Sequence, residues 1–296
     1  MKKVFNIPTK VCSDFDGYSF FSELDNYFNG CIKEQIALDF SKTTWFEANL
    51  CAALGALINK AENKFNQIRF VKLSSSLKDI FSRNHFLANF GGAKIPDHNS
   101  TTIKYRKNKI IEDKLIKEFL DRELIDKPDF PKLSEPAKYE IIRSIFEIYS
   151  NAVIHGDCEY VYSCGQFYPN KIPPRIDFTI VDIGKSIKKN VNDFLNSDLT
   201  GVDAILWALA DNNTTKPKAK NIPGGLGLKI ICEFARLNKG KVQIVSNNGY
   251  WQQTVSGESS KSLFHAFPGT LVNLEFNLDD KSFYYLKDEP IEEIIF

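Results

Sequence analysis

The sequence predicts an α/β protein made of two blocks, with a polar segment between them. In the first block, strand-like and helix-like stretches alternate between residues 17 and 91, which is typical of a small sheet with helices packed against it. The second block, from about residue 134 to 276, again contains both helical and strand patterns. With 296 residues, 43% hydrophobic content and 24 Phe, the chain can bury a sizeable core.

Five elements are expected in the first block. The pattern predicts helices over about 17–28, 43–61 and 77–90, and strands over 36–41 and 68–73. Thr44 and Glu47 have the spacing of a capping box before the second helix. Gly91 and Gly92 are expected to end the third helix.

The middle of the chain is polar. Residues 93–110 are basic and lack a hydrophobic period, so we expect a linker or an edge segment there. A charged helix is expected from Ile111 to Leu124, before a segment with several prolines. The second block then opens at Ser134, a candidate N-cap with Pro136 in the first turn, and its helix is expected to run to Gly156.

The remaining elements complete the second block. Strands are expected near 160–167 and 175–182, followed by an irregular, Lys-rich stretch at 186–223 with a helical piece near 202–210. A helix is expected from about 227 to 239, then a hairpin with its turn at Asn248 and Gly249, and a last strand at 269–276. We therefore predict a small α/β domain at 1–95, a linker with a helix at 96–133, a larger α/β domain at 134–280 and a tail at 281–296.

The composition argues against several classes of protein. Lys plus Arg total 38 and Asp plus Glu total 37, so the net charge of +1 gives no general attraction to nucleic acid or to an anionic membrane. No apolar run approaches the about 20 residues of a transmembrane helix, and the N-terminus lacks the apolar region of a signal peptide. Six scattered cysteines without a CxxC pair do not form a disulfide scaffold. We expect a cytoplasmic protein with reduced thiols.

Three polar residues recur at every fourth position of an otherwise apolar helix: Glu147, Asn151 and His155. Four residues advance a helix by about 400°, so the three form one edge beside the core-facing side. An amide oxygen suits Mg²⁺, which takes few protein ligands and keeps phosphate oxygens. A carboxylate one turn earlier can orient or deprotonate a water or a hydroxyl. For His155, a neutral packing or capping role is the favoured alternative to phosphate binding.

Two further motifs lie later in the second block. Asp182 ends an apolar strand and is followed by Gly184, and an Asp in that position can accept a hydrogen bond from an exocyclic amine. Taken alone, it would be interpreted as an Asp that opens a turn. Gly224, Gly225 and Gly227 precede an apolar helix, whose free backbone N–H groups favour phosphate.

Together, and in this order, the three motifs resemble the nucleotide-binding boxes of the GHKL superfamily, which includes gyrase, Hsp90, histidine kinases and MutL. E-x3-N-x3-H-G resembles the N box, D-I-G-K-S-I the first glycine box and G-G-L-G-L the second, while Gly269-Thr270 resembles the late Gly-Thr of the family. The resemblance covers about residues 134–278. It implies ATP and Mg²⁺ as ligands and a Bergerat-type α/β sandwich, in which helices cover one face of a mixed sheet.

The resemblance also implies a role for each motif residue. Asn151 would hold Mg²⁺ on the ATP phosphates, and Glu147 would be the general base. Asp182 would accept the adenine amine, with Thr270 beside it, and Gly184 would let the chain pass close to the base.

The phosphate end is implied to lie between the lid, residues 186–223, and the helix after the second glycine box. The implied phosphate contacts are Thr215, Lys216, Gly225, Leu226, Gly227 and Leu228. One departure from the family pattern is Ser186, which replaces the second glycine of the first box. Serine fits there unless the residue needs a positive φ, so the lid geometry depends on it.

The first block resembles a STAS domain, the fold of anti-anti-sigma factors that are partners of GHKL anti-sigma kinases. This resemblance implies a protein partner that binds through the N-terminal domain. Such domains often carry a phosphorylatable Ser near the start of a helix. The matching positions here are Ala48 and Asn49, which argues against a phosphoswitch at that place.

Two functions remain open at this level. One is Mg²⁺-dependent ATP hydrolysis or phosphoryl transfer to a protein partner with Glu147 as base, and the other is a non-hydrolysing, nucleotide-gated interaction module. A self-contained histidine kinase is not expected, because no two-helix phosphoacceptor hairpin is evident between residues 93 and 133. The sequence argues against a membrane or nucleic-acid partner and leaves a homodimer open.

Overall fold

A five-stranded sheet forms the centre of the protein, as seen in a computed structural model that describes residues 3–109, 113–127, 129–154, 156–210, 213, 215 and 226–289. The strand order is β10-β11-β9-β8-β6, and every neighbouring pair in it is antiparallel. The α/β class is confirmed, but the mixed sheet that we expected is wrong. The strands are β6 (Thr102–Lys109), β8 (Tyr160–Tyr168), β9 (Arg175–Asp182), β10 (Lys241–Thr254) and β11 (Gly257–Asn277).

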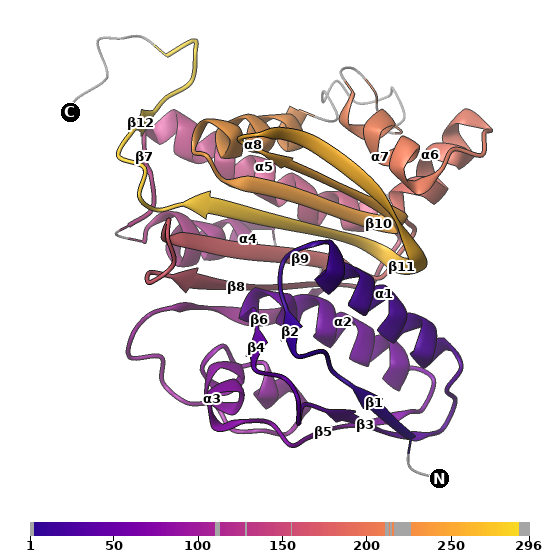
Figure 1. The fold of residues 1–296 in the computed structure, drawn as a ribbon. Coiled ribbons are helices and arrows are strands. Elements are labelled where there is room, and N and C mark those ends of the chain that lie inside the picture. Colours follow the sequence, from indigo (N-terminus) through magenta and orange to yellow (C-terminus); the bar gives the residue numbers. More distant parts are fainter. Residues whose placement is uncertain are drawn as a thin grey trace.

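Helices cover both faces of this sheet, whereas one covered face was predicted (Figure 1). On one face lie α4 (Asp113–Leu120), α5 (Glu135–Ile154) and α8 (Leu226–Leu237). On the other lie α1 (Phe15–Asn29) and α2 (Cys51–Glu62), which contact β11, β9 and β8. Since successive side chains of a strand point to opposite faces, both faces of the sheet are buried against helices.

The strand β9 illustrates this alternation. Ile176, Phe178 and Ile180 belong to the apolar core shared with α5 and α8. Asp177 and Thr179, between them, face the N-terminal block and are fully buried there. One strand thus contributes an apolar face to one layer and a polar face to the other.

The N-terminal block adds a second, smaller sheet beyond α1 and α2 (Figure 1). Its strands β1 (Lys3–Asn6), β3 (Gln35–Asp39) and β5 (Gln67–Val71) run parallel in the order β1-β3-β5. A small α/β unit was expected here, and its likeness to a STAS domain stays a prediction. One hydrophobic cluster joins this block to the large sheet and so extends across the predicted domain boundary; it includes Phe21, Leu54, Tyr162, Val245 and Leu271.

The shorter elements complete the described chain. They are β2 (Lys10–Val11) paired with β4 (Trp45–Phe46), α3 (Ser75–Arg83), α6 (Ile187–Leu195), α7 (Gly201–Leu209), and β7 (Lys132–Leu133) paired with β12 (Phe283–Tyr284). Short 3₁₀ segments span Ala48–Leu50 and Leu87–Phe90, and a π-helical turn spans Asp121–Ile125. None of the helices in these described ranges has the length and apolar character needed to cross a bilayer.

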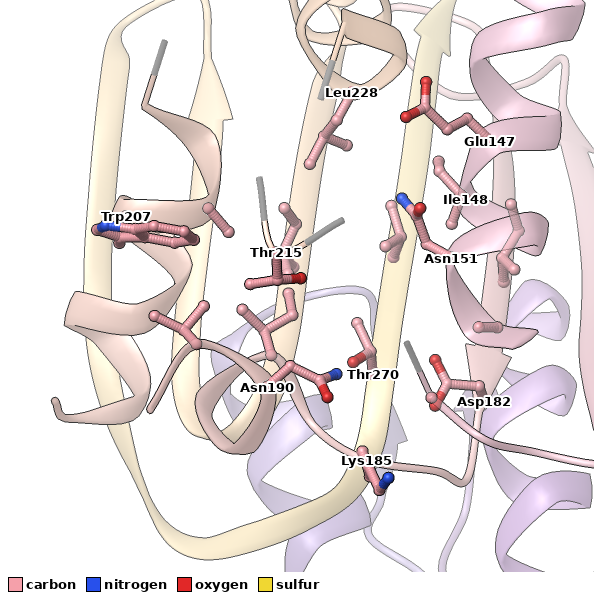
Figure 2. A pocket seen from close by; sticks show the side chains of 18 of the residues that line it. Glu147, Ile148, Asn151, Asp182, Lys185, Asn190, Trp207, Thr215, Leu228 and Thr270 are labelled. Atoms are coloured by element: carbon pink, nitrogen blue, oxygen red, sulfur yellow. The ribbon is translucent and has the colours of Figure 1, made fainter. Parts of the chain in front are cut away.

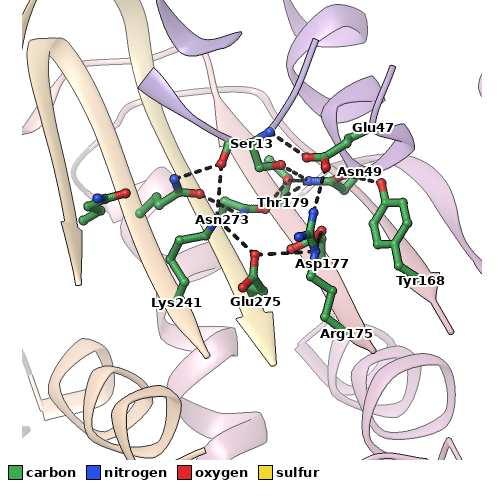
Figure 3. Close-up of polar contacts among 12 residues, drawn as sticks. Ser13, Glu47, Asn49, Tyr168, Arg175, Asp177, Thr179, Lys241, Asn273 and Glu275 are labelled. Atoms are coloured by element: carbon green, nitrogen blue, oxygen red, sulfur yellow. Dashed lines mark hydrogen bonds and ion pairs between the residues drawn. The ribbon is translucent and has the colours of Figure 1, made fainter. Parts of the chain in front are cut away.

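Asn49 anchors the N-terminal block to the large sheet (Figure 3). Its Nδ2 lies 2.8 Å from Ser13 Oγ, 2.9 Å from Thr179 Oγ1 and 3.1 Å from Asn273 Oδ1. Asn49 and the neighbouring Ala48 are both completely buried. The expected likeness to a STAS domain would put a phosphorylatable Ser at these positions, and here both residues are buried against the sheet.

An ion-pair cluster continues this network toward the edge of the interface. Arg175 binds Glu47 through Nη2 at 2.7 Å and Asp177 through Nε at 3.0 Å. The second Glu47 oxygen accepts the Ser13 N–H at 2.6 Å. Burial and the nearby Glu275 raise the pKa of Asp177 well above its usual value. The block is therefore attached through buried polar contacts as well as through apolar packing.

Several predicted elements are confirmed and others need correction. β9 has the predicted bounds, and Ser134 caps α5 by accepting the Ala137 N–H at 3.2 Å. The capping box is wrong: Glu47 binds Ser13 and Arg175, and α2 begins only at Cys51. The long third helix is also wrong, because it ends at Arg83 and a 3₁₀ segment follows later. The edge segment is confirmed as β6 at the end of the sheet.

The predicted hairpin turn at Asn248 and Gly249 is wrong. β10 continues through these residues with an irregular register, and the chain reverses after Thr254 instead. A Cβ at Gly249 would lie 2.4 Å from the Gly201 carbonyl carbon. Gly249 therefore allows the start of α7 to approach the strand, which is a different use of glycine from a turn.

Candidate functional site

A cavity lies between α5, the strands β9 and β11, and the helices α6 and α7 (Figure 2). Its volume is about 160 Å³, close to the roughly 150 Å³ of a cavity that holds benzene. Apolar side chains from the sheet and the helices form most of its wall, among them Ile148, Ile180, Val191, Ile244 and Val272. It can enclose a small flat ring system, so a longer ligand has to extend toward the mouth.

α5 contributes Glu147 and Asn151, one turn apart. Both line the cavity, while Ile145 and Tyr149 on the adjacent side of the helix are fully buried in the core. Asn151 Oδ1 is buried and has no hydrogen-bond partner among the described residues. A buried carbonyl oxygen without a partner is unfavourable, so this atom is suited to receive a donor or a cation.

β9 contributes Asp182, which is 7% exposed and faces the cavity. Its Oδ1 accepts the Gly184 N–H at 3.0 Å. Burial raises the pKa of this carboxyl to about 7, while the backbone N–H groups of Gly184 and Thr270 act in the opposite direction. A perturbed carboxyl in a cavity is a common property of binding and catalytic sites.

β11 contributes Thr270, which is the register partner of Asp182 across the sheet. Its hydroxyl lies 3.0 Å from Ser246 Oγ of β10, and Ser246 Oγ also accepts the N–H of Ile187 at 2.8 Å. The start of α6 is thereby fastened to two strands of the sheet. Gly269 makes the approach of β11 to β9 possible, since a Cβ there would lie 2.1 Å from the Asp182 carbonyl oxygen.

Gly184 lies against the end of α5 and is not part of the cavity lining. A Cβ at this position would be 2.1 Å from the Gly156 carbonyl oxygen, and that oxygen accepts the Lys185 N–H at 2.6 Å. The glycine therefore lets the turn after β9 pack against Gly156, just beyond the helix that carries Asn151. The resemblance implied a different role for Gly184, which was to let the chain pass close to the base.

Ser186 is compatible with the lid geometry. Its φ is −70°, so no glycine is required, and its side chain caps α6 by accepting the Lys189 N–H. The helix α6 itself was missed in the sequence, where 186–223 was interpreted as irregular. It brings Asn190 into the cavity lining, which also includes Lys185 from the preceding turn and Trp207 from α7. The spacing of Ile187, Val191 and Leu195 would have indicated this helix.

Some of the other predicted site residues lie in the described part of the chain, and the rest lie outside it. Thr215 and Leu228 line the cavity, and Leu226 and Gly227 form the first residues of α8. His155, Lys216 and Gly225 lie outside the described residues. The residues predicted to bind adenine, Asp182 and Thr270, and those predicted to act at the phosphates, Glu147 and Asn151, therefore line one cavity.

The chain matches no protein-family model, no curated protein and no solved structure. The support for a function consequently comes from the chemistry of the cavity and from the spacing of the motifs that form it.

Proposed function

We propose that this protein binds ATP in the cavity, with Mg²⁺, in the manner of the GHKL superfamily. The observation that supports this most directly is that Asn151 from α5 and Asp182 from β9 line one cavity. Glu147 and Thr270 line it as well. All four were singled out by motif spacing from separate parts of the sequence. If Asn151 and Asp182 lay on opposite sides of the domain, they could not bind one nucleotide.

Adenine would occupy the end of the cavity next to Asp182. The apolar walls exclude water from a flat ring, and the carboxylate accepts a hydrogen bond from the exocyclic amine. Guanine carries an oxygen at the equivalent place, which would present an acceptor to the buried carboxyl where adenine presents a donor. Sites built to bond an N–H group reject analogues without it by roughly 10⁴. We therefore expect ATP to bind far more tightly than GTP.

The phosphates would extend toward Glu147, because Asn151 lies between Asp182 and Glu147 along the cavity (Figure 2). Asn151 Oδ1, which has no hydrogen-bond partner in the part of the chain that the structure describes, fits a hard cation such as Mg²⁺. When bound, the cation would neutralise charge on the phosphate oxygens.

Glu147 makes catalysis the favoured form of the proposal. Nucleotide binding alone needs no carboxylate near the phosphates, whereas a general base must lie close to the attacking water or hydroxyl. The acceptor would be water or a hydroxyl of a protein partner, as in anti-sigma kinases. A cytoplasmic location is part of the same proposal, since ATP is available there.

The test combines binding and turnover on the purified full chain. Calorimetry with ATP and GTP, with and without Mg²⁺, is performed on wild type, Asn151→Ala and Asp182→Asn. Turnover of γ-labelled ATP is followed for wild type, Glu147→Gln and the control Glu140→Gln, whose residue lies on the same helix and pairs with Arg143. Absence of ATP binding to wild type, or Mg²⁺-dependent binding that survives in Asn151→Ala, would contradict the proposal.

The turnover arm separates the enzyme from the alternative module. Loss of turnover in Glu147→Gln with unchanged ATP affinity selects catalysis, provided that Glu140→Gln behaves as wild type. ATP binding without turnover in any variant, also with candidate protein acceptors added, selects a nucleotide-gated interaction module.

A further inference from the structure

The helix α6 presents one amide side chain to the cavity between apolar ones. Ile187, Asn190 and Val191 line the cavity from this helix, since residues three and four apart share one helix face. Val191 is buried, whereas Lys189 is exposed and forms an ion pair with Asp193 on the outer side. The inner face of α6 therefore combines two apolar side chains with one amide.

The position of α6 is fixed, because hydrogen bonds hold the helix at both ends. At its start the Ser186 side chain caps the first turn, and the N–H of Ile187 donates to Ser246 Oγ. At its end the Asn192 side chain accepts the Leu199 N–H at 2.7 Å and donates to the Leu199 carbonyl at 3.0 Å. A side chain carried by such a helix is pre-organised for recognition.

The amide also lies at the base end of the cavity. Figure 2 shows the side chain of Asn190 directed toward Thr270 and Asp182, on the far side of the cavity from Glu147. A carboxyl and an amide thus enclose the same end from different elements, β9 and α6. One offers acceptors, and the other offers both a donor and an acceptor.

We propose that Asn190 is a specificity-determining residue that reads the amine and N7 edge of adenine, which deepens the proposed function and rests on it. An Asn amide matches this edge in a bidentate way: its carbonyl accepts from the exocyclic amine and its NH₂ donates to N7. The amine has two hydrogens, so Asp182 takes the other one. Both hydrogens of the amine and its neighbouring ring nitrogen are then used in recognition.

The experiment pairs a side-chain change with a change in one ligand atom. ATP and 7-deaza-ATP, which lacks the N7 acceptor, are titrated into wild type and Asn190→Leu. Leu has a similar size and suits an apolar helix face, so the fold should be retained, and circular dichroism checks this. Lys189→Ala, on the outer side of the same helix, is the matched control.

The expected result is a coupled loss. A bidentate contact to a base corresponds to roughly a tenfold to hundredfold effect, so Asn190→Leu should weaken ATP binding by that factor. Wild type should lose part of that factor on 7-deaza-ATP, which keeps the amine but lacks N7, and Asn190→Leu should distinguish little between the two ligands. Lys189→Ala should behave as wild type.

Two outcomes overturn the inference while leaving the proposed function intact. In one, ATP binding depends on Asp182 but not on Asn190; in the other, Asn190→Leu weakens ATP and 7-deaza-ATP by the same factor. If wild type binds neither ligand, the proposed function itself fails, and the inference fails with it.

Discussion

Asp182→Asn should stabilise the protein at neutral pH while it removes ATP binding. The substitution keeps the shape of the side chain, and the new amide oxygen can still accept the Gly184 N–H. It removes an ionisable carboxyl that is 7% exposed and whose pKa is raised by burial to about 7. Burial of that charge disfavours the folded state, so its removal is favourable at every pH above the ordinary pKa of 3.8.

The magnitude follows from proton linkage. The ordinary pKa of the group is 3.8 and its folded value is about 7, a difference of about 3 units at about 1.4 kcal/mol each, or up to about 4 kcal/mol. Well below pH 3.8 both the folded and the unfolded carboxyl are protonated, so the charge has no effect. From there to pH 7 the unfolded state ionises more readily, and the free energy of unfolding of wild type falls. Above pH 7 the deficit is constant.

The assay is urea unfolding of wild type and Asp182→Asn at pH 4.5, 6 and 8. The variant has no ionisable group at this position, so its advantage in the free energy of unfolding should grow from about 1 kcal/mol at pH 4.5 to as much as about 4 kcal/mol at pH 8. Asp193→Asn, at an exposed position, is the control, and its effect on the free energy of unfolding should be small because an exposed ion pair contributes little. A difference between Asp182→Asn and wild type that is flat, or that shrinks as the pH rises, would refute the reasoning.

Three further predictions concern the surroundings of the cavity. Asn49→Leu removes the buried hydrogen bonds to Ser13, Thr179 and Asn273 and should lower the free energy of unfolding by roughly 3 kcal/mol in urea titrations; an unchanged midpoint would contradict the role of the network. Gly184→Ala should lower both the melting temperature and the ATP affinity, because its Cβ would collide with the Gly156 carbonyl; wild-type values for both would show that the contact can relax. ATP should change the intrinsic fluorescence of wild type, and Trp207→Phe should remove most of that signal with affinity retained; a signal that persists would assign it to another Trp.

Local chemistry made much of the second block predictable from sequence. The apolar run that ends in Asp182 gave the observed strand, and the Ser134 cap gave the start of α5. The four-residue spacing of Glu147 and Asn151 put both on one helix edge, as the structure shows. Such signals depend on residues close together in the chain, and these need no knowledge of the tertiary fold.

What sequence reasoning missed depends on contacts between distant segments. Glu47 has the spacing of a capping residue, but its carboxylate is taken by Arg175 from the large sheet. Gly249 follows an Asn, as in a turn, but its missing side chain makes room for Gly201. The helices on the second face of the sheet were missed for the same reason. No local pattern near α1 in the sequence indicates that it packs on strands far away in the chain.

The candidate site shows the same division. Asp182 and Asn151 are part of short motifs and were found, whereas Asn190 and Trp207 were not, because no motif includes them. Asn190 could have been found from the apolar residues that flank it at helical spacing in α6. Trp207 enters the cavity only because α7 packs on β10, and that contact leaves no local pattern.

The two-sided use of β9 makes this strand intolerant of changes in length. Inserting or deleting one residue upstream of Asp182 would exchange the two sets of side chains, since a slip by one place turns each to the opposite side. Ile176 and Phe178 would then face the hydrogen-bond network around Asn49, and Asp177 and Thr179 would be buried in the apolar core next to α5. Homologous chains with this architecture should accordingly differ in their loops while the spacing from Arg175 to Asp182 stays the same.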